Sequence, residues 1–128
     1  MNAARSRRLI ELAEHYFACV DRMDLKATLA CFAPDARFCI ATFDQQYHGR
    51  DSGIRCMFER LNTRYASVWH GDFDHVTQGP DRIASRFRVE NRGLDGQTSV
   101  KNNCNFFRLR GELLEEVFVY MSGDNSLR

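Results

Sequence analysis

Apolar residues recur through the first third of the chain at the spacing of α-helices. The first run places six of them on one helical face: Leu9, Leu12, Ala13, Tyr16, Phe17 and Val20. A shorter stripe of Leu25, Leu29 and Phe32 follows Asp24, a residue type that caps helix N-termini. The pattern therefore predicts two helices, the second beginning after Asp24 and ending at Pro34.

A third helix is predicted after Gly49, beginning near Asp51 or Ser52. Its apolar face consists of Ile54, Met57, Phe58 and Leu61. Arg55 and Glu59 stand four residues apart on another face, at the spacing of a helical ion pair, which supports the assignment.

The rest of the chain alternates apolar and polar residues in the manner of strands. Strands are predicted over residues 36–41, 45–48, 67–78, 82–91, 98–109 and 112–121. Gly79-Pro80 and the segment RGLDGQ provide turns between them. Helices mixed with a short hairpin, followed by a long meander, favour an α+β fold. We expect one domain over residues 1–128, with three helices packed on one face of a curved, mostly antiparallel sheet.

The last predicted strand is apolar on both sides. Leu113, Glu115, Val117, Val119 and Met121 alternate with Leu114, Glu116, Phe118 and Tyr120. Because helices cover only one face of such a sheet, the other face needs a different cover. A second copy of the chain would supply it, so the pattern predicts a homodimer through the convex face of the sheet.

The charge of the chain is balanced, with 18 Lys and Arg against 17 Asp and Glu. This balance argues against broad electrostatic binding of nucleic acid or an anionic membrane. The first residues contain neither a signal-peptide core nor a membrane span, so a cytoplasmic protein is expected. The five cysteines, at positions 19, 31, 39, 56 and 104, are odd in number and lack CxxC spacing. They predict reduced, buried thiols without a disulfide or metal site, with a nucleophilic role for one of them as the alternative.

Three segments in this order carry a family resemblance: HYFACVDRMDLKATLACFAPDARF, then YHGRDSGIR, then NFFRLRGELLEEVFVYMSG. Together they resemble the nuclear transport factor 2-like superfamily, and within it the SnoaL-like and ketosteroid-isomerase-like proteins. The resemblance implies a cystatin-like conical barrel, open at one end, with a pocket between sheet and helices. Members of this superfamily include isomerases, polyketide cyclases, epoxide hydrolases, dehydratases and non-catalytic binding domains, so the fold alone does not fix a reaction.

The Asp-Leu pair at 24–25 and Phe32 can be aligned with the ketosteroid isomerases. This alignment identifies the positions of this chain that correspond to the isomerase site residues. The resemblance places the oxyanion-binding tyrosine on Tyr16 and the protonated aspartate that assists it on Asn105. The proton-shuttling aspartate falls on Ile40, which cannot accept a proton. The resemblance thus implies that Tyr16 and Asn105 polarise a ligand oxygen, while the usual base is missing at Ile40. The alternative for Tyr16 is an ordinary tyrosine of the hydrophobic core.

Glu116 is a candidate for a relocated acid or base. If the last strand alternates regularly, Glu116 shares the pocket side with Phe118 and Tyr120, where apolar surroundings would raise the pKa of its carboxyl group. A one-residue bulge would exchange Glu116 with Glu115 and turn it outward.

The segment HGDFDH offers a second candidate. His70, Asp72 and Asp74 alternate on one strand face, which could supply metal ligands. Some related dehydratases and cyclases use a His/Asp pair as acid and base, so His70 with Asp72 is a possible catalytic pair. A solvated or dimer-facing strand is the alternative.

A pocket lining is expected from the sheet and the third helix. Asn103 and Asn105 share a strand face with Lys101 and Phe107, so they line the pocket if Phe107 points inward; otherwise they are polar residues beside a turn or at an interface. The other expected lining residues are Phe38, Ile40, Met57, Phe58, Trp69, Phe73, Phe87, Val89, Phe107, Phe118 and Tyr120. An ordinary core has the same composition, so this pattern does not separate lining from core.

The first functional hypothesis is a small-molecule enzyme that acts on a hydrophobic, oxygen-bearing ring compound. The expected chemistry is isomerisation, cyclisation, dehydration or hydrolysis by acid/base catalysis, with no cofactor. A non-catalytic ligand-binding or association domain is the second hypothesis, favoured by the loss of ionisable groups at Ile40 and Asn105. A structural subunit like the small subunit of ring-hydroxylating dioxygenases is the third.

Overall fold

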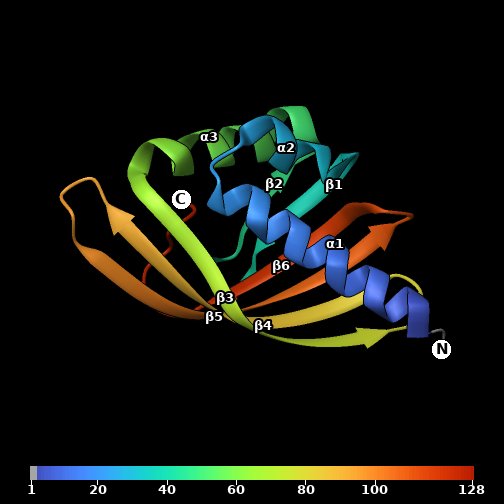
Figure 1. The fold of residues 1–128 in the computed structure, drawn as a ribbon. Coiled ribbons are helices and arrows are strands. Elements are labelled where there is room, and N and C mark those ends of the chain that lie inside the picture. The colour runs from blue at the N-terminus through green and yellow to red at the C-terminus, as the bar shows by residue number, and fades with distance from the viewer. Residues whose placement is uncertain (1–2) are drawn as a thin grey trace.

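A computed structural model describes residues 3–128 and contains three α-helices and six strands in this range (Figure 1). The helices are α1 (Ala3–Asp21), α2 (Leu25–Ala30) and α3 (Arg55–Arg64), with a 3-10 turn η1 (Ala41–Phe43) and a π-helical turn η2 (Gly49–Ile54). The strands are β1 (Phe32–Ile40), β2 (Gln45–His48), β3 (Tyr65–Gln78), β4 (Arg82–Gly93), β5 (Thr98–Arg110) and β6 (Leu113–Met121). No helix within residues 3–128 is long and apolar enough to cross a membrane.

The six strands form one sheet in the order β2-β1-β6-β5-β4-β3. The pairing of β1 with β6 is parallel, and all the other pairings are antiparallel. The sheet curves, and the helices lie on its concave side (Figure 1). This arrangement confirms the predicted α+β fold with three helices on a curved, mostly antiparallel sheet.

The two ends of α2 show what the sequence pattern predicted correctly and where it failed. The Asp24 side chain accepts a hydrogen bond of 3.0 Å from the Ala27 backbone, which confirms the N-cap. The helix ends at Ala30, however, and Pro34 lies inside β1 rather than ending α2. Pro34 is tolerated there because the register of β1 against β6 is irregular between Phe32 and Arg37, where a missing N–H costs the ladder little.

The predicted third helix begins with a wider turn. The segment from Gly49 to Ile54 is π-helical, and the regular helix starts only at Arg55. Gly49 has φ +83°, and a Cβ atom there would lie 2.3 Å from the Ser52 hydroxyl oxygen, so this turn requires glycine. The predicted ion pair between Arg55 and Glu59 is present at 3.7 Å.

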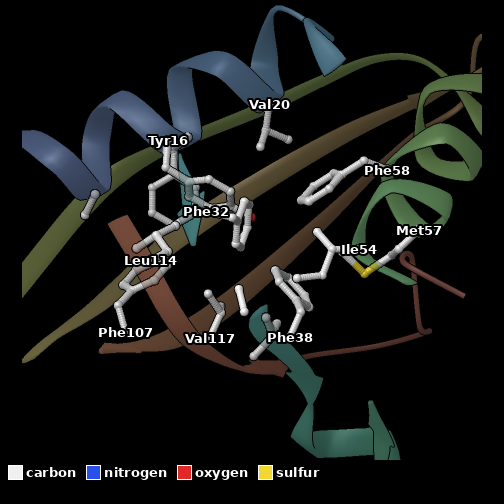
Figure 2. Close-up of a cluster of buried hydrophobic side chains, with 14 of the residues drawn as sticks. Tyr16, Val20, Phe32, Phe38, Ile54, Met57, Phe58, Phe107, Leu114 and Val117 are labelled. Carbon is white, nitrogen blue, oxygen red and sulfur yellow. The ribbon is translucent and has the colours of Figure 1, made fainter. Parts of the chain in front are cut away.

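Aromatic side chains fill the space between helices and sheet. Figure 2 shows Tyr16 and Val20 projecting from α1 toward Phe58 of α3 and Phe38 of β1. The Tyr16 ring meets Phe32 edge-on, with ring centroids 5.6 Å apart. This packing fixes α1 across the concave face, which positions its residues over the inner side of the sheet.

The outer face of the sheet is not covered in the single chain. Cross-strand register aligns Val76, Ala84, Phe106 and Phe118 in one row across β3, β4, β5 and β6. Val76 and Phe106 are exposed, and Tyr120 beside them is 48% exposed. The sequence predicts that both faces of the last strand are buried. Within one chain, only the inner face of β6 is buried.

Candidate functional site

A small cavity lies between the helices and the inner face of the sheet. Its volume is about 40 Å³. It is lined by Tyr16, Phe17, Val20, Phe38, Phe58, Leu61, Val68, His70, Phe87, Val89, Asn91, Asn103, Asn105, Val119, Ser126 and Leu127. The cavity is far below the roughly 300–1,000 Å³ of a site for a ring compound.

Two asparagines of β5 line this cavity without hydrogen-bond partners. Lys101, Asn103, Asn105 and Phe107 alternate on the inner side of β5, and all four are buried. The side-chain oxygens of Asn103 and Asn105 are buried, and no donor within residues 3–128 reaches either of them. A buried acceptor without a donor costs about 1–3 kcal/mol, so both amides are candidates for contact with a ligand.

His70 lines the same cavity and is oriented by Asp21, the last residue of α1. The Asp21 carboxylate accepts from His70 Nδ1 at 2.5 Å and from the His70 backbone N–H at 3.1 Å. Because an ionised carboxylate only accepts, Nδ1 is the donor to Asp21, and in the neutral imidazole the lone pair is then on Nε2. Within residues 3–128, Nε2 makes no hydrogen bond. The ring packs between Phe17 and Phe87, at 5.1 and 5.6 Å between centroids.

A β-bulge separates His70 from the aspartates that follow it. The register of β3 against β4 shifts between Gly71 and Asp74, and Asp72 takes a left-handed backbone with φ 56°. Asp72 and Asp74 are exposed, whereas the His70 side chain is only 14% exposed. The expected shared face of His70, Asp72 and Asp74 is therefore wrong, because the bulge inserts an extra residue and reverses the alternation. The partner of His70 is Asp21, not Asp72.

A second bulge turns Glu116 away from the cavity. The pairing of β5 with β6 shifts between Arg108 and Leu109, so the buried side of β6 carries Leu114 and then Val117. Glu116 is held on the outer face by Arg37 at 2.5 Å and Arg108 at 3.5 Å. The expected pocket-facing position of Glu116 is wrong for this reason. Its two arginine partners place the Glu116 carboxylate in an ion-pair network outside the cavity.

The bulge in β6 also turns the two aromatic residues that follow it. Phe118 lies on the outer face, half-buried beneath the Arg37 guanidinium, and Tyr120 is exposed. Trp69 is likewise 42% exposed on the outer face of β3. These three expected lining residues do not reach the cavity.

Tyr16 enters the cavity as a neutral phenol. Its side chain is buried, and no hydrogen bond within residues 3–128 involves its hydroxyl group. Burial, with smaller effects from Cys31 and Asp21, raises the pKa of Tyr16 above its ordinary value. The hydroxyl is therefore a proton-bearing donor at neutral pH.

The other expected lining residues divide between cavity and core. Phe38, Phe58, Phe87 and Val89 line the cavity. Ile40, Met57 and Phe107 are fully packed and lie among the core residues without lining it, and Phe73 packs beside Phe17 at 5.0 Å. Sequence reasoning missed Asp21, because its partner is 49 residues away and nothing in the local pattern connects the two.

The C-terminal residues 122–128 close one side of the cavity through Ser126 and Leu127. The buried Lys101 ammonium donates to the carbonyl oxygens of Ser122, at 2.8 Å, and Asp124. Arg64 at the end of α3 donates to the carbonyl oxygen of Ser126 at 2.9 Å. The segment is thus held by cations on its carbonyl groups, by a hydrogen bond of 2.8 Å from the Asn125 side chain to Gln45, and by Leu127, which packs against the core.

The curved sheet, the helices across its concave side and the cavity between them make a conical α+β fold of the nuclear transport factor 2-like type. Within this class the chain belongs to the SnoaL-like domain family, whose model matches residues 13–117. No curated protein matches the chain.

Solved structures share the fold at low sequence identity. A protein from Xanthomonas campestris pv. campestris, provisionally assigned as a polyketide cyclase, has a TM-score of 0.81 at 21% identity, with 91% of each chain covered. A Catenulispora acidiphila protein with a ketosteroid isomerase-like fold, in complex with trimethylamine, has a TM-score of 0.77 at 16% identity, covering 86% of this chain and 84% of that one. TerC, co-crystallised with polyporic acid, has a TM-score of 0.75 at 17% identity, covering 88% and 89%.

Proposed function

We propose that the chain binds a small, oxygen-bearing ring compound in the cavity and transfers a proton on it through His70, without a cofactor. The observation that carries this proposal is the meeting of three unpartnered polar groups in one cavity: His70 Nε2 and the side-chain oxygens of Asn103 and Asn105. Buried polar groups without partners are rare in folded proteins and cluster where a ligand completes them.

His70 acts as the base and then as the acid. Asp21 holds the imidazole through Nδ1 and the His70 backbone N–H, so Nε2 is the atom that takes the proton. When Nε2 is protonated, the Asp21 carboxylate stabilises the imidazolium, and the proton returns to another ligand atom from the same nitrogen. This pair takes the place of the base that is absent at Ile40.

The opposite groups orient the ligand. Tyr16 donates to a carbonyl or hydroxyl oxygen, and the amide oxygens of Asn103 and Asn105 accept from ligand hydroxyl groups. Phe38, Phe58 and Phe87 provide apolar walls for a ring. The polyporic acid bound by TerC and the polyketide-cyclase assignment of the Xanthomonas protein support this ligand class.

Entry of a ring compound requires a change of shape. The cavity of about 40 Å³ is too small, and residues 122–128 form a wall that belongs to no helix or strand and is tied to the rest of the chain by hydrogen bonds from Lys101 and Arg64. We infer that this segment moves outward when ligand enters.

The small cavity also favours a second candidate function, binding without catalysis. The buried Ile40 cannot exchange protons, and a cavity of about 40 Å³ fits a protein that holds a small ligand. The two candidates differ in one outcome: only a catalyst loses turnover when His70 is replaced.

Substitution of Asn105 tests the ligand site. Asn105→Leu keeps the branched shape of the side chain but removes the unpartnered amide, so the free energy of unfolding is expected to rise by about 1–3 kcal/mol. Binding of phenolic and quinone ring compounds, followed by NMR shifts of the Asn103 side-chain amide, is expected in the wild type and lost in Asn105→Leu. The exposed Asn102 of the same strand is the matched control, and Asn102→Leu should leave binding unchanged. Equal binding by Asn105→Leu and wild type would contradict the proposal.

We also propose a homodimer in which a second copy covers the outer face of the sheet. The row of Val76, Ala84, Phe106 and Phe118 is continuous across four strands, and Tyr120 extends it. Such a contiguous apolar row is typical of a protein interface.

A further inference from the structure

A second cluster of reactive side chains lies outside the cavity, where α1 packs on α2. His15, Cys19 and Cys31 bring one imidazole and two thiols together, and their ligand atoms all lie within 4.8 Å of one another. None of the three lines the cavity. Cys19 lies on α1 and Cys31 caps the end of α2. The prediction of no metal site rested on the lack of CxxC spacing, and that criterion does not detect two cysteines brought together by the packing of two helices.

The fold presents the three groups from two elements. His15 and Cys19 are four residues apart on α1, which puts them on one helical face, with Nε2 and Sγ 3.5 Å apart. Cys31 is the C-cap of α2 and approaches from the other side. Zinc bonds of about 2.0–2.3 Å in a tetrahedral site separate ligand atoms by roughly 3.3–3.8 Å. The His15–Cys19 separation already fits, and Cys31 sits within a small side-chain rotation of it.

The surroundings suit a metal with one open position. Cys19 is fully buried, Cys31 is half-buried and His15 is exposed. His15 and Cys31 also line a surface groove of about 230 Å³ between α1, α2 and the β5–β6 turn. Arg22 donates to the Cys19 sulfur at 3.5 Å, which is the kind of outer hydrogen bond that supports a metal-bound thiolate.

We propose that His15, Cys19 and Cys31 bind one zinc ion, with the fourth coordination position open to the groove. Two thiolates and a neutral imidazole are the ligand set that selects zinc among the common divalent cations, and the two thiolates balance its charge. The ion would tie α1 to α2 and so fix the helix pair that covers the sheet. This site is independent of the proton transfer proposed for His70.

Zinc titration of the reduced, chelator-treated protein against a chromogenic chelator tests the site. The expected result is one zinc per chain, a thiolate-to-metal charge-transfer band when cobalt replaces zinc, and a melting temperature raised by roughly 5–10 °C at 100-fold excess over the dissociation constant. His15→Ala changes an exposed side chain and should not disturb folding. It is expected to weaken zinc binding more than about 100-fold, since even outer partners of a metal site are worth about 10–100-fold.

Matched variants separate the site from adventitious binding. Cys31→Ser should remove the cobalt charge-transfer band or reduce it strongly, whereas His48→Ala and Cys56→Ser, which alter exposed residues outside the cluster, should bind zinc like the wild type. Absence of zinc binding under reducing conditions, or equal affinity in His15→Ala and wild type, would overturn the proposal.

Discussion

At the scale of single residues, the cavity combines groups that are costly to bury alone. Among residues 3–128, Tyr16, Asn103 and Asn105 each lack a hydrogen-bond partner for at least one side-chain atom, and His70 Nε2 makes no hydrogen bond. A packed apolar core would be more stable without them. The folded chain is therefore less stable than it would be with apolar residues at these positions. Such a loss of stability is typical of a binding or catalytic site.

Because Tyr16 is buried, its contribution to the free energy of unfolding depends on pH. Its pKa is raised in the folded chain by burial, so unfolding releases a proton above pH 10.0, the ordinary pKa of tyrosine. The contribution of Tyr16 to stability is complete below pH 10.0 and is lost as the pH rises further, by up to about 1.4 kcal/mol per pH unit. Urea unfolding at increasing pH should show a shallower alkaline loss for Tyr16→Phe than for wild type.

The exposed Tyr120 is the control for this measurement, and Tyr120→Phe should follow the wild-type curve. An identical alkaline slope for Tyr16→Phe and wild type would show that the Tyr16 hydroxyl is not held in a dry environment.

At the scale of elements, the sequence predicts well where the strands lie. It predicts poorly which side chains of a strand point to the inner face of the sheet. Periodicity places nearly every helix and strand, and the Asn103 and Asn105 face follows correctly because β5 is regular around them. In β3 and β6, one bulge each reverses the alternation, which sends Asp72 and Glu116 outward. A bulge depends on pairing with the neighbouring strand, so local alternation does not reveal it. For the same reason, the contact of Asp21 with His70 is visible only in the folded chain.

The C-terminal segment is the element that controls access in this account. Arg64→Ala removes the hydrogen bonds from α3 to residues 126 and 128, and opening of the segment is expected to become roughly tenfold more frequent. Amide hydrogen exchange of residues 124–127 should rise accordingly, and ligand association should become faster.

Arg55→Ala, which removes only a surface ion pair on the same helix, is the control for that experiment. If exchange and association in Arg64→Ala match those of Arg55→Ala, the segment is not the gate.

At the scale of the whole molecule, the inner face of the sheet carries the site, and the outer face remains apolar in the single chain. The row containing Phe106 and Phe118 borders a row of charges from Arg108, Glu116 and Arg37. An apolar strip beside paired charges is the composition expected of a partly polar protein interface.

Phe106→Arg tests the proposed homodimer. Placing a charge in the middle of the apolar row should convert a dimer into a monomer in light scattering coupled to size-exclusion chromatography. Leu94→Arg, at a residue that is 74% exposed in the β4–β5 turn, should leave the dimer intact. A wild-type monomer at all concentrations would contradict this proposal.

The most direct test of the central claim is turnover by His70→Gln and Asp21→Asn, with a ring compound that the wild type converts. Loss of the base or of its orienting carboxylate should reduce kcat about 10²–10⁴-fold while binding to the asparagine side remains. The exposed His48→Gln variant should retain full activity. Unchanged kcat in His70→Gln would contradict the assignment of His70 as the group that moves the proton.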